Sequence, residues 1–386
     1  MDEKLLQFAT KRQAEYLEAV SKHGSQRAAA RAMGVNFTAV NQAMRALEAK
    51  AAQHGYSPDH DLTHPVAPGQ RLRGTSTLYD EAGNARMQWV KTQEDRSQQE
   101  ELMREAIAAL CEDIDPVKKT KAPKVSNDQL MSIYPVGDHH IGMLSWREET
   151  GADYDTGESE RLLMGAMDHL VESAPQSETG VIILMGDFLH YDSFESVTPQ
   201  SKHQLDADSR YPRMVRAAFK TIRFVIDRAL NKHRSVKVVV SSGNHDPSSM
   251  AFLREAVAVL YSEDRRVFVD RSPKAFHYIT HGNCLIGVHH GDKVKMPNLP
   301  ILMANDMPSE WGATKHRYIY TGHVHHDSVK DLVGARVESL RILPPQDAWA
   351  YNAGYRAGRD MKRIDMHAEY GEVARHLVTP EMLAGS

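Results

Sequence analysis

The sequence is poor in cysteine and has no long apolar stretch. Two cysteines, Cys111 and Cys284, in 386 residues are too few for a framework of disulfide bonds, so we expect a reducing compartment such as the cytoplasm. No apolar run approaches the ~20 residues that a membrane helix needs, which argues against a membrane protein. No apolar segment follows basic residues near the amino terminus, so we also expect no secretory signal.

A large excess of positive charge is absent as well. The net charge of −4 argues against a protein that coats nucleic acid over its whole surface, although a local basic patch stays open. Hydrophobic residues at 41% and charged residues at 25% are typical of a soluble protein, and the length allows about two or three domains. Histidine is the unusual residue, with 21 copies.

Residues 1–55 have the pattern of a small helical module. Ser25 and Asn36 are suitable N-caps for two successive helices, Gly34 suits the turn between them, and Ala30 lets the helices approach closely. Val35, Val40 and Leu47 supply the apolar side. The pattern resembles a helix-turn-helix, whose second helix enters the major groove of DNA.

The second helix would then present five side chains to DNA as base or phosphate contacts: Phe37, Thr38, Asn41, Gln42 and Arg45. The alternative is a helical hairpin that binds a protein or a second copy of this chain as a homodimer.

Residues 56–127 are predicted to be a linker region. Within it, 71–78 and 86–91 form a predicted β-hairpin, and 97–111 an amphipathic helix. Trp89 on the hairpin either grips a phosphate backbone together with basic neighbours or anchors the hairpin by packing against another element.

Residues 128–345 alternate between short strands rich in Val and Ile and helices over 158–172, 211–232 and 247–261. After residue 267 the strands crowd together, so we predict an α/β fold, a β-sandwich flanked by helices. Residues 346–386 are left as a carboxyl-terminal tail without a role.

Five strands of this region end in a polar motif: Gly137-Asp138-His139-His140, Gly186-Asp187-Phe188-Leu189-His190, Gly243-Asn244-His245-Asp246, His289-His290-Gly291 and Gly322-His323-Val324-His325. Ligand sites gather at the carboxyl ends of strands in α/β sheets. Residues two apart, such as Asp138 and His140, lie on one face and can grasp one ion. Mixed imidazole and oxygen donors suit Mn, Fe, Zn or related divalent ions, and Asp187 alone could span two ions ~3.5–4 Å apart.

In this order, the motifs resemble the signature of the calcineurin-like metallophosphoesterase superfamily, over roughly residues 129–345. The resemblance implies two divalent metal ions, most readily Mn, with Fe, Zn, Ni or Mg as alternatives. The implied ligands are Asp138, His140 and His325 for one ion, Asn244, His290 and His323 for the other, and Asp187 between them. His290 is preferred to His289 because the family ligand stands directly before the glycine.

The resemblance also implies that a hydroxide held by the metals attacks a phosphodiester. His245 matches the family histidine that contacts the phosphate or the leaving oxygen, and Asp246 would orient it. The motif ending in His190 resembles that of repair exonucleases such as the nuclease subunit of SbcCD, where His190 positions the substrate or leaving group; a structural role is the alternative.

The chain departs from that branch because no DNA-capping domain follows Leu343 and a helix-turn-helix comes first. The combination resembles predicted phosphoesterases of tailed bacteriophages, so we expect a bacterial or phage-infected cell and no obligatory ATPase partner. The predicted function is a Mn-dependent DNA nuclease, exo- or endonucleolytic, that docks DNA through residues 1–55. The alternatives are a phosphatase, a cyclic-nucleotide phosphodiesterase, or a DNA-binding regulator on a phosphoesterase scaffold.

Overall fold

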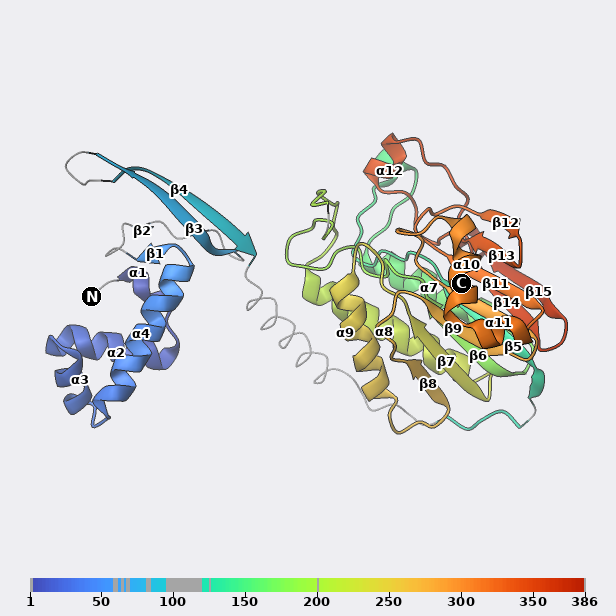
Figure 1. The fold of residues 1–386 in the computed structure, drawn as a ribbon, viewed down its shortest axis with the longest axis horizontal. Coiled ribbons are helices and arrows are strands. Elements are labelled where there is room, and N and C mark those ends of the chain that lie inside the picture. Colours follow the sequence, from blue (N-terminus) through green and yellow to red (C-terminus); the bar gives the residue numbers. More distant parts are fainter. Residues whose placement is uncertain are drawn as a thin grey trace. The chain divides into compact units, whose positions relative to one another are not determined.

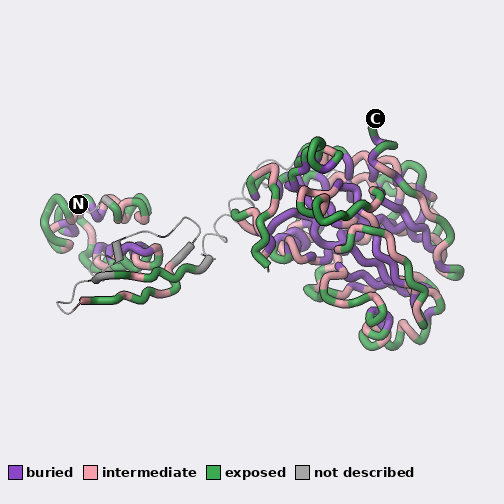
Figure 2. The backbone as a smooth tube through the Cα atoms, turned by 90° about the horizontal axis from the view of Figure 1, so that it is seen from above, coloured by how far each residue is buried: buried purple, intermediate pink, exposed green. Residues whose placement is uncertain are grey.

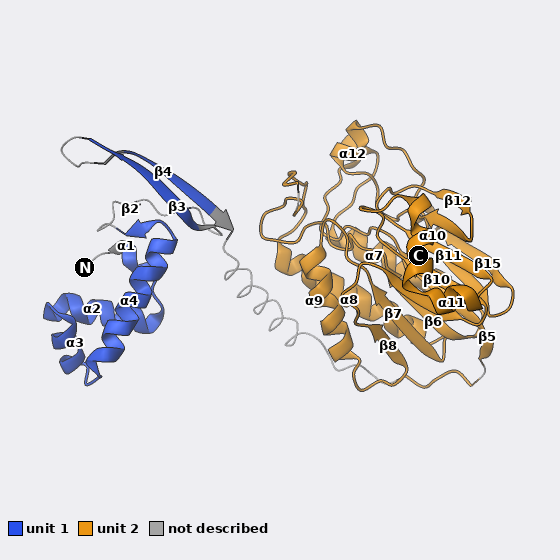
Figure 3. Ribbon diagram, viewed as in Figure 1, with its two compact units in different colours: residues 1–105 blue, residues 106–386 orange. Residues whose placement is uncertain are grey.

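The chain forms two compact units. A computed structural model describes residues 3–57, 62–63, 66, 70–80, 85–94, 120–124, 126–199 and 201–384. The first unit comprises residues 1–105 and the second residues 106–386 (Figure 3). The amphipathic helix predicted over 97–111 lies outside the described residues.

The first unit begins with four helices: α1 (Glu3–Leu6), α2 (Lys11–His23), α3 (Gln26–Ala32) and α4 (Phe37–Gln53). The Ser25 side chain accepts the amide of Ala28 to cap α3, and the Asn36 side chain accepts that of Thr38 to cap α4. Gly34 makes the turn between them at φ 64°, a conformation that other residues rarely adopt. Both predicted helices therefore form where the sequence places them.

A small apolar core holds these helices together. Its buried members are Tyr16, Leu17, Ala30, Val40, Met44 and Leu47. Val40, Met44 and Leu47 recur at the spacing of one helix face, so α4 buries a single stripe and leaves its other side in solvent. Val35, expected in this core, is only partly buried, and Met44 was not foreseen.

Short strands complete the first unit. β1 (Tyr56–Ser57) pairs with β2 (Leu62–Thr63), and the predicted hairpin is confirmed as β3 (Gln70–Tyr79) paired antiparallel with β4 (Ala85–Glu94). The interpretation of Trp89 as a packing anchor is wrong. Its exposed fraction is 55%, because it lies opposite small Ser76 on a hairpin face that leaves the indole in solvent.

The second unit contains two sheets. The six-stranded sheet has the order β15-β14-β5-β6-β7-β8, and the five-stranded sheet the order β12-β13-β11-β10-β9. The strands of the first are β5 (Asn127–Val136), β6 (Ser177–Leu184), β7 (Ser235–Val240), β8 (Val267–Asp270), β14 (Met361–His367) and β15 (Gly371–Val378). Those of the second are β9 (His277–His281), β10 (Cys284–Val288), β11 (His316–Thr321), β12 (Ser328–Leu332) and β13 (Ala335–Ser339).

Helices cover the outer faces of both sheets, as Figure 1 shows. The helices are α6 (Arg147–Thr150), α7 (Thr156–Glu172), α8 (Tyr211–Leu230), α9 (Pro247–Leu260), α10 (Leu299–Asp306), α11 (Pro308–Ala313) and α12 (Ala348–Asn352), with short turns η2 (Met296–Asn298) and η3 (Pro380–Leu383). Among the described residues no helix has the length and apolar character needed to cross a bilayer.

The core forms layers because β6 buries both of its faces. Ile182 and Leu184 join the cluster beneath α7, α8 and α9, whereas Val181 and Ile183 pack between the two sheets. In Figure 2 the buried residues accordingly run along the strands inside this unit. The predicted α/β class, with sheets flanked by helices, is confirmed.

The carboxyl-terminal segment is not a separate tail. Residues 346–386 supply β14 and β15, and β14 pairs antiparallel with β5 in the six-stranded sheet. β14 is difficult to predict from the sequence because it carries three charged residues, Lys362, Arg363 and Asp365. All three are buried and form ion pairs. A buried strand that carries paired charges lacks the apolar pattern from which strands are predicted.

Candidate metal centre

The predicted ligands follow strands whose carboxyl ends lie at the same edge. β5, β6 and β7 are parallel neighbours in one sheet, and β10 and β11 are parallel neighbours in the other. The loops after these five strands carry Asp138 and His140, Asp187, Asn244, His290, and His323 and His325. All seven side chains therefore come from the carboxyl ends of parallel strands, where ligand sites gather in α/β sheets.

One group of potential ligands consists of Asp138, His140 and His325. One ligand atom from each lies within 4.8 Å of the others. His325 Nε2 is 2.9 Å from Asp138 Oδ2 and 3.4 Å from His140 Nε2. The other oxygen of the fully buried Asp138, Oδ1, has no hydrogen-bond partner among the described residues. A buried carboxylate oxygen without a donor is costly and is suited to accept a cation.

A second group consists of Asp187, His290 and His323, again within 4.8 Å of one another. His290 Nε2 lies 3.3 Å from Asp187 Oδ2 and 3.0 Å from Asn244 Oδ1. The amide oxygen of Asn244 is therefore adjacent to this second group. The structure thus brings all seven predicted ligands together.

The geometry also separates His290 from its neighbour. His290 Nδ1 donates to the carbonyl of Met185 at 3.0 Å, which turns Nε2 toward Asp187. The ring of His289 instead stacks on Phe276 at 4.5 Å, and its Nδ1 accepts the amide of Gly291. His290, and not His289, therefore faces the group.

The backbone at this edge is strained where the ligands stand. His140, Asp187, His323 and His325 adopt φ values of 45°, 47°, 67° and 55°, a region that costs non-glycine residues about 1–3 kcal/mol each. Such strain persists only where surrounding structure over-determines it, and it clusters at functional sites.

Two glycines allow the carboxylates to lie this close to neighbouring backbone. A Cβ at Gly243 would lie 1.9 Å from Asp187 Oδ1, and one at Gly322 would lie 2.3 Å from Asp138 Oδ1. Any side chain at either position would displace a carboxylate. Both glycines are therefore required by packing around the site.

His190 and His245 lie beside the first group. His245 Nε2 is 4.0 Å from Asp187 Oδ2, and His190 Nδ1 is 3.3 Å from His140 Nδ1. One ring atom each of His140, His190 and His245 also fall within 4.8 Å. The Nε2 atom of His190 is buried and has no hydrogen-bond partner within the part of the chain that the structure describes. Both predicted catalytic histidines are thus adjacent to the ligands.

The contacts of Asp246 differ from those expected. Its carboxylate accepts the amides of Asp187 (3.2 Å), Leu189 (2.9 Å) and Gly243 (3.2 Å). The ring of His245 is held instead by the carbonyl of His190, 2.8 Å from Nδ1. The expectation that Asp246 orients His245 is therefore wrong: backbone amides converge on this carboxylate, which positions the loop that carries Asp187.

Opposite charges are balanced inside the site. Burial opposes protonation of His290. The carboxylates of Asp187 and Asp138 outweigh burial and raise the pKa of His290 to about 10. Burial also opposes ionisation of Asp187, but the charge of His290 holds the pKa of Asp187 well below its usual range. Burial and the nearby histidine His245 lower the pKa of His190 to about 3. At neutral pH Asp187 is therefore ionised beside a protonated His290, whereas His190 is neutral.

This donor set fits divalent metal ions. Two buried carboxylates, an amide oxygen and several neutral imidazoles are the mixture preferred by Mn, Fe and Zn. The partnerless oxygen of Asp138 and the glycines that make room for both carboxylates are consistent with the same use.

The five predicted DNA contacts lie on α4 in the first unit. Phe37, Thr38, Gln42 and Arg45 are exposed. Asn41 is half-buried, and its amide donates to Gln26 Oε1 at 3.0 Å. Four of the five side chains are therefore free to face a partner, and Asn41 is engaged within the helix pair.

Polar residues that were not expected from the sequence lie behind the loop that carries His323 and His325. Ser339 donates to the carbonyl of His326, and Lys362 to Asp327. The one available signal was the position of Asp327, two residues after a predicted ligand; Lys362 lies in the segment that was left without a role.

Comparisons with known proteins add little. No family model matches the chain, and no curated protein matches it. A conserved uncharacterized protein from Streptococcus pneumoniae TIGR4, described as a predicted phosphoesterase, is similar over 65% of this chain and 91% of its own, at 11% identity and a TM-score of 0.30. Wild-type Vps29 complexed with zinc, from Entamoeba histolytica, is similar over 64% of this chain and 98% of its own, at 14% identity and a TM-score of 0.29. Vacuolar Protein Sorting 29 from Cryptosporidium parvum is similar over 64% and 96%, at 12% identity and a TM-score of 0.29. At TM-scores this low, no property of these proteins is transferred to this chain.

Proposed function

We propose that the protein is a metal-dependent phosphodiesterase that acts as a DNA nuclease. The observation that carries the proposal is the pair of ligand groups, Asp138–His140–His325 and Asp187–His290–His323, each with its ligand atoms within 4.8 Å. Two such groups at the carboxyl ends of strands from both sheets, with an acidic residue in each, are what a two-metal hydrolase requires.

In this proposal Asp138, His140 and His325 hold one divalent ion, preferably Mn. Asn244, His290 and His323 hold the other, and Asp187 serves both. When bound, such ions lower the pKa of water and offset charge that develops on phosphorus.

The neighbouring histidines bind and orient the substrate. The carbonyl of His190 accepts a hydrogen bond from Nδ1 of His245, which fixes the tautomer and leaves Nε2 on the side of Asp187. With a second proton on Nε2, as the imidazolium, His245 could donate a hydrogen bond to a phosphate oxygen or a proton to the leaving oxygen. His190, deeply buried beside His140, supports the same end of the site.

The first unit docks the DNA. α4 offers Phe37, Thr38, Gln42 and Arg45 on its exposed side, and the guanidinium of Arg27 lies 5.3 Å above the ring of Phe37. A helix that follows a tight turn and carries polar and cationic residues on its open face is suited to the major groove.

The test is cleavage of labelled single- and double-stranded DNA by the full chain with Mn²⁺, compared with Asp187→Asn. We expect cleavage that depends on the metal and is lost in the variant. Hydrolysis of nitrophenyl phosphate esters with DNA left intact would replace the nuclease with a phosphatase. Tight DNA binding without any turnover would contradict catalysis altogether.

A further inference from the structure

The loop that carries His323 and His325 needs to be held in place. We call residues 322–327 the histidine loop. His323 and His325 both adopt positive φ values, 67° and 55°, and Gly322 brings the backbone against Asp138. A loop with two strained residues relaxes unless contacts outside it prevent relaxation.

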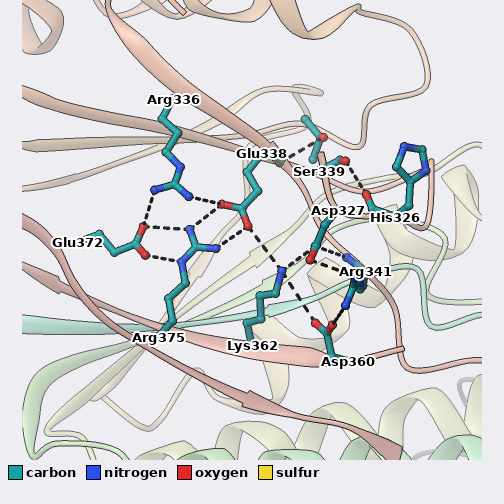
Figure 4. Close-up of polar contacts among 11 residues, drawn as sticks. His326, Asp327, Arg336, Glu338, Ser339, Arg341, Asp360, Lys362, Glu372 and Arg375 are labelled. Carbon is teal, nitrogen blue, oxygen red and sulfur yellow. Dashed lines mark hydrogen bonds and ion pairs between the residues drawn. The ribbon is translucent and has the colours of Figure 1, made fainter. Parts of the chain in front are cut away.

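Four contacts hold the carboxyl end of the histidine loop, and one of them is the ion pair of Arg341 Nε with Asp327 Oδ2 at 3.4 Å. Lys362 Nζ donates to Asp327 Oδ1 at 2.6 Å, and the amide of Arg341 donates to the same oxygen at 3.3 Å. Ser339 Oγ donates to the carbonyl of His326 at 2.7 Å. Figure 4 shows Asp327 directed at Lys362 and Ser339 directed at the backbone of His326.

These contacts belong to a larger network that joins the two sheets. The carboxylate of Glu338 in β13 accepts hydrogen bonds from both terminal nitrogens of Arg375 in β15, each at 2.6 Å. Nζ of Lys362 in β14 lies 3.6 Å from Glu338 Oε1. Arg336 adds longer contacts of 3.7 Å to Glu338 and 3.8 Å to Glu372 (Figure 4). The network thus connects the histidine loop to the carboxyl-terminal strands.

The network is balanced in charge, and three of its eight residues are buried while the others are partly exposed. Its acids are Asp327, Glu338, Asp360 and Glu372, and its bases are Arg336, Arg341, Lys362 and Arg375. Glu338, Asp360 and Lys362 have exposed fractions of only 1%, 2% and 8%. Removing one partner from a buried pair leaves an uncompensated charge, so each group has a narrow choice of positions.

We propose that Lys362, through Asp327, and Ser339, through the carbonyl of His326, are positioning residues that hold His323 and His325 in ligand geometry. The carboxyl-terminal strands β14 and β15 would then complete the metal centre rather than merely extend a sheet. The part of this inference that concerns metal rests on the proposed function; the part that concerns the loop does not.

The loop is tested first in the metal-free full-length protein. Lys362→Met removes the closer of the two cations beside Asp327, since Arg341 Nε lies 3.4 Å from Asp327 Oδ2, and Lys362→Arg restores a cation at position 362. Arg336→Met is the matched control, because it removes a cation from the same network but contacts Glu338 and Glu372 instead of the histidine loop. Hydrogen exchange of the backbone amides of residues 323–327 is measured, and thermal midpoints show the loss of general stability.

We expect faster exchange in the histidine loop for Lys362→Met, recovery in Lys362→Arg, and wild-type exchange for Arg336→Met. Ser339→Ala supplies a second variant if Lys362→Met does not fold, with the same expectation. Equal exchange in Lys362→Met and Arg336→Met, or faster exchange spread evenly over the second unit, would overturn the proposal.

The same variants are then titrated with Mn²⁺ by calorimetry. Loss of groups that orient metal ligands typically weakens affinity about 10–100-fold, and we expect this for Lys362→Met but not for Arg336→Met. Unchanged affinity in Lys362→Met would overturn the link to the metal centre. A wild-type protein that binds no Mn²⁺ but shows the expected exchange pattern would overturn the proposed function and leave the loop's positioning intact.

Discussion

The two units place their candidate functional residues in opposite surroundings. In the second unit Asp138 and Asp187 have exposed fractions of 0% and 1%, whereas Phe37 in the first unit is 39% exposed. Buried carboxylates and imidazoles require partners, so their convergence restricts what the site can do. An exposed helix face carries no such requirement. Structure therefore constrains the chemistry of the second unit far more tightly than the partner of the first.

Gly243→Ala is expected to have the largest effect, and to affect the second unit alone. The new Cβ would meet Asp187 Oδ1 at 1.9 Å and force the carboxylate away. We expect bound metal and DNA cleavage to fall to the level of Asp187→Asn, whereas DNA affinity, which the proposed function assigns to the first unit, stays unchanged. Metal analysis, cleavage assays and filter binding measure the three quantities.

Gly312→Ala is the control for that change, because nothing lies within 4 Å of the corresponding Cβ. It should keep the metal and the activity of the wild type. Normal metal content in Gly243→Ala would show that Asp187 is not a ligand.

Replacing His245 separates catalysis from metal binding within the second unit. General acid–base groups contribute about 10²–10⁴-fold to rate, so His245→Gln should reduce kcat by that order while two metal ions per chain remain. His203, an exposed histidine of the same unit, supplies the control His203→Gln. Loss of metal in His245→Gln would instead make His245 a ligand.

A third prediction concerns stability, which in the second unit depends on buried polar groups. The ring of His233 is bonded to the hydroxyls of Tyr134 and Ser177, each at 2.7 Å, and burial lowers the pKa of His233 to about 4 from 6.5. Below pH 6.5 His233 becomes protonated in the unfolded chain but stays neutral in the folded protein until the pH approaches 4. The free energy of unfolding should therefore fall, by up to about 3 kcal/mol, as the pH drops from 6.5 to 4.

Denaturant unfolding of the wild type and of His233→Gln at several pH values measures this effect. The variant should be less stable at pH 7 and should lose part of the pH dependence. Parallel pH profiles for the two proteins would refute the assignment to His233.

The smallest effect is expected in the first unit. Arg45→Gln removes one exposed cation from α4, so DNA affinity should fall a few-fold and the slope of log affinity against log salt should decrease by about 1. Lys50→Gln is the control, since five residues along a helix place Lys50 about 140° away from Arg45. Equal effects of both changes would mean that α4 does not present one face to DNA.

Much of the second unit could be predicted because its signals are local. Short Val-rich runs ending in Gly-Asp or Gly-Asn-His-Asp mark β6 and β7, and all seven predicted ligands converge. β14 could not be predicted, because Lys362 bonds to Asp327 and Asp365 to Ser132, both distant in the sequence, and the charges obscure the strand pattern. The part of Asp246 was misjudged for a similar reason, since its partners are backbone amides that only the folded loops bring together.

The central claim is that two ions lie between the buried ligands of the second unit. Anomalous diffraction from crystals of the full-length protein grown with Mn²⁺ tests it most directly. The account predicts two manganese peaks, one against Asp138, His140 and His325 and one against Asn244, His290 and His323, with Asp187 touching both. An absence of manganese from this edge at saturating concentration would contradict it.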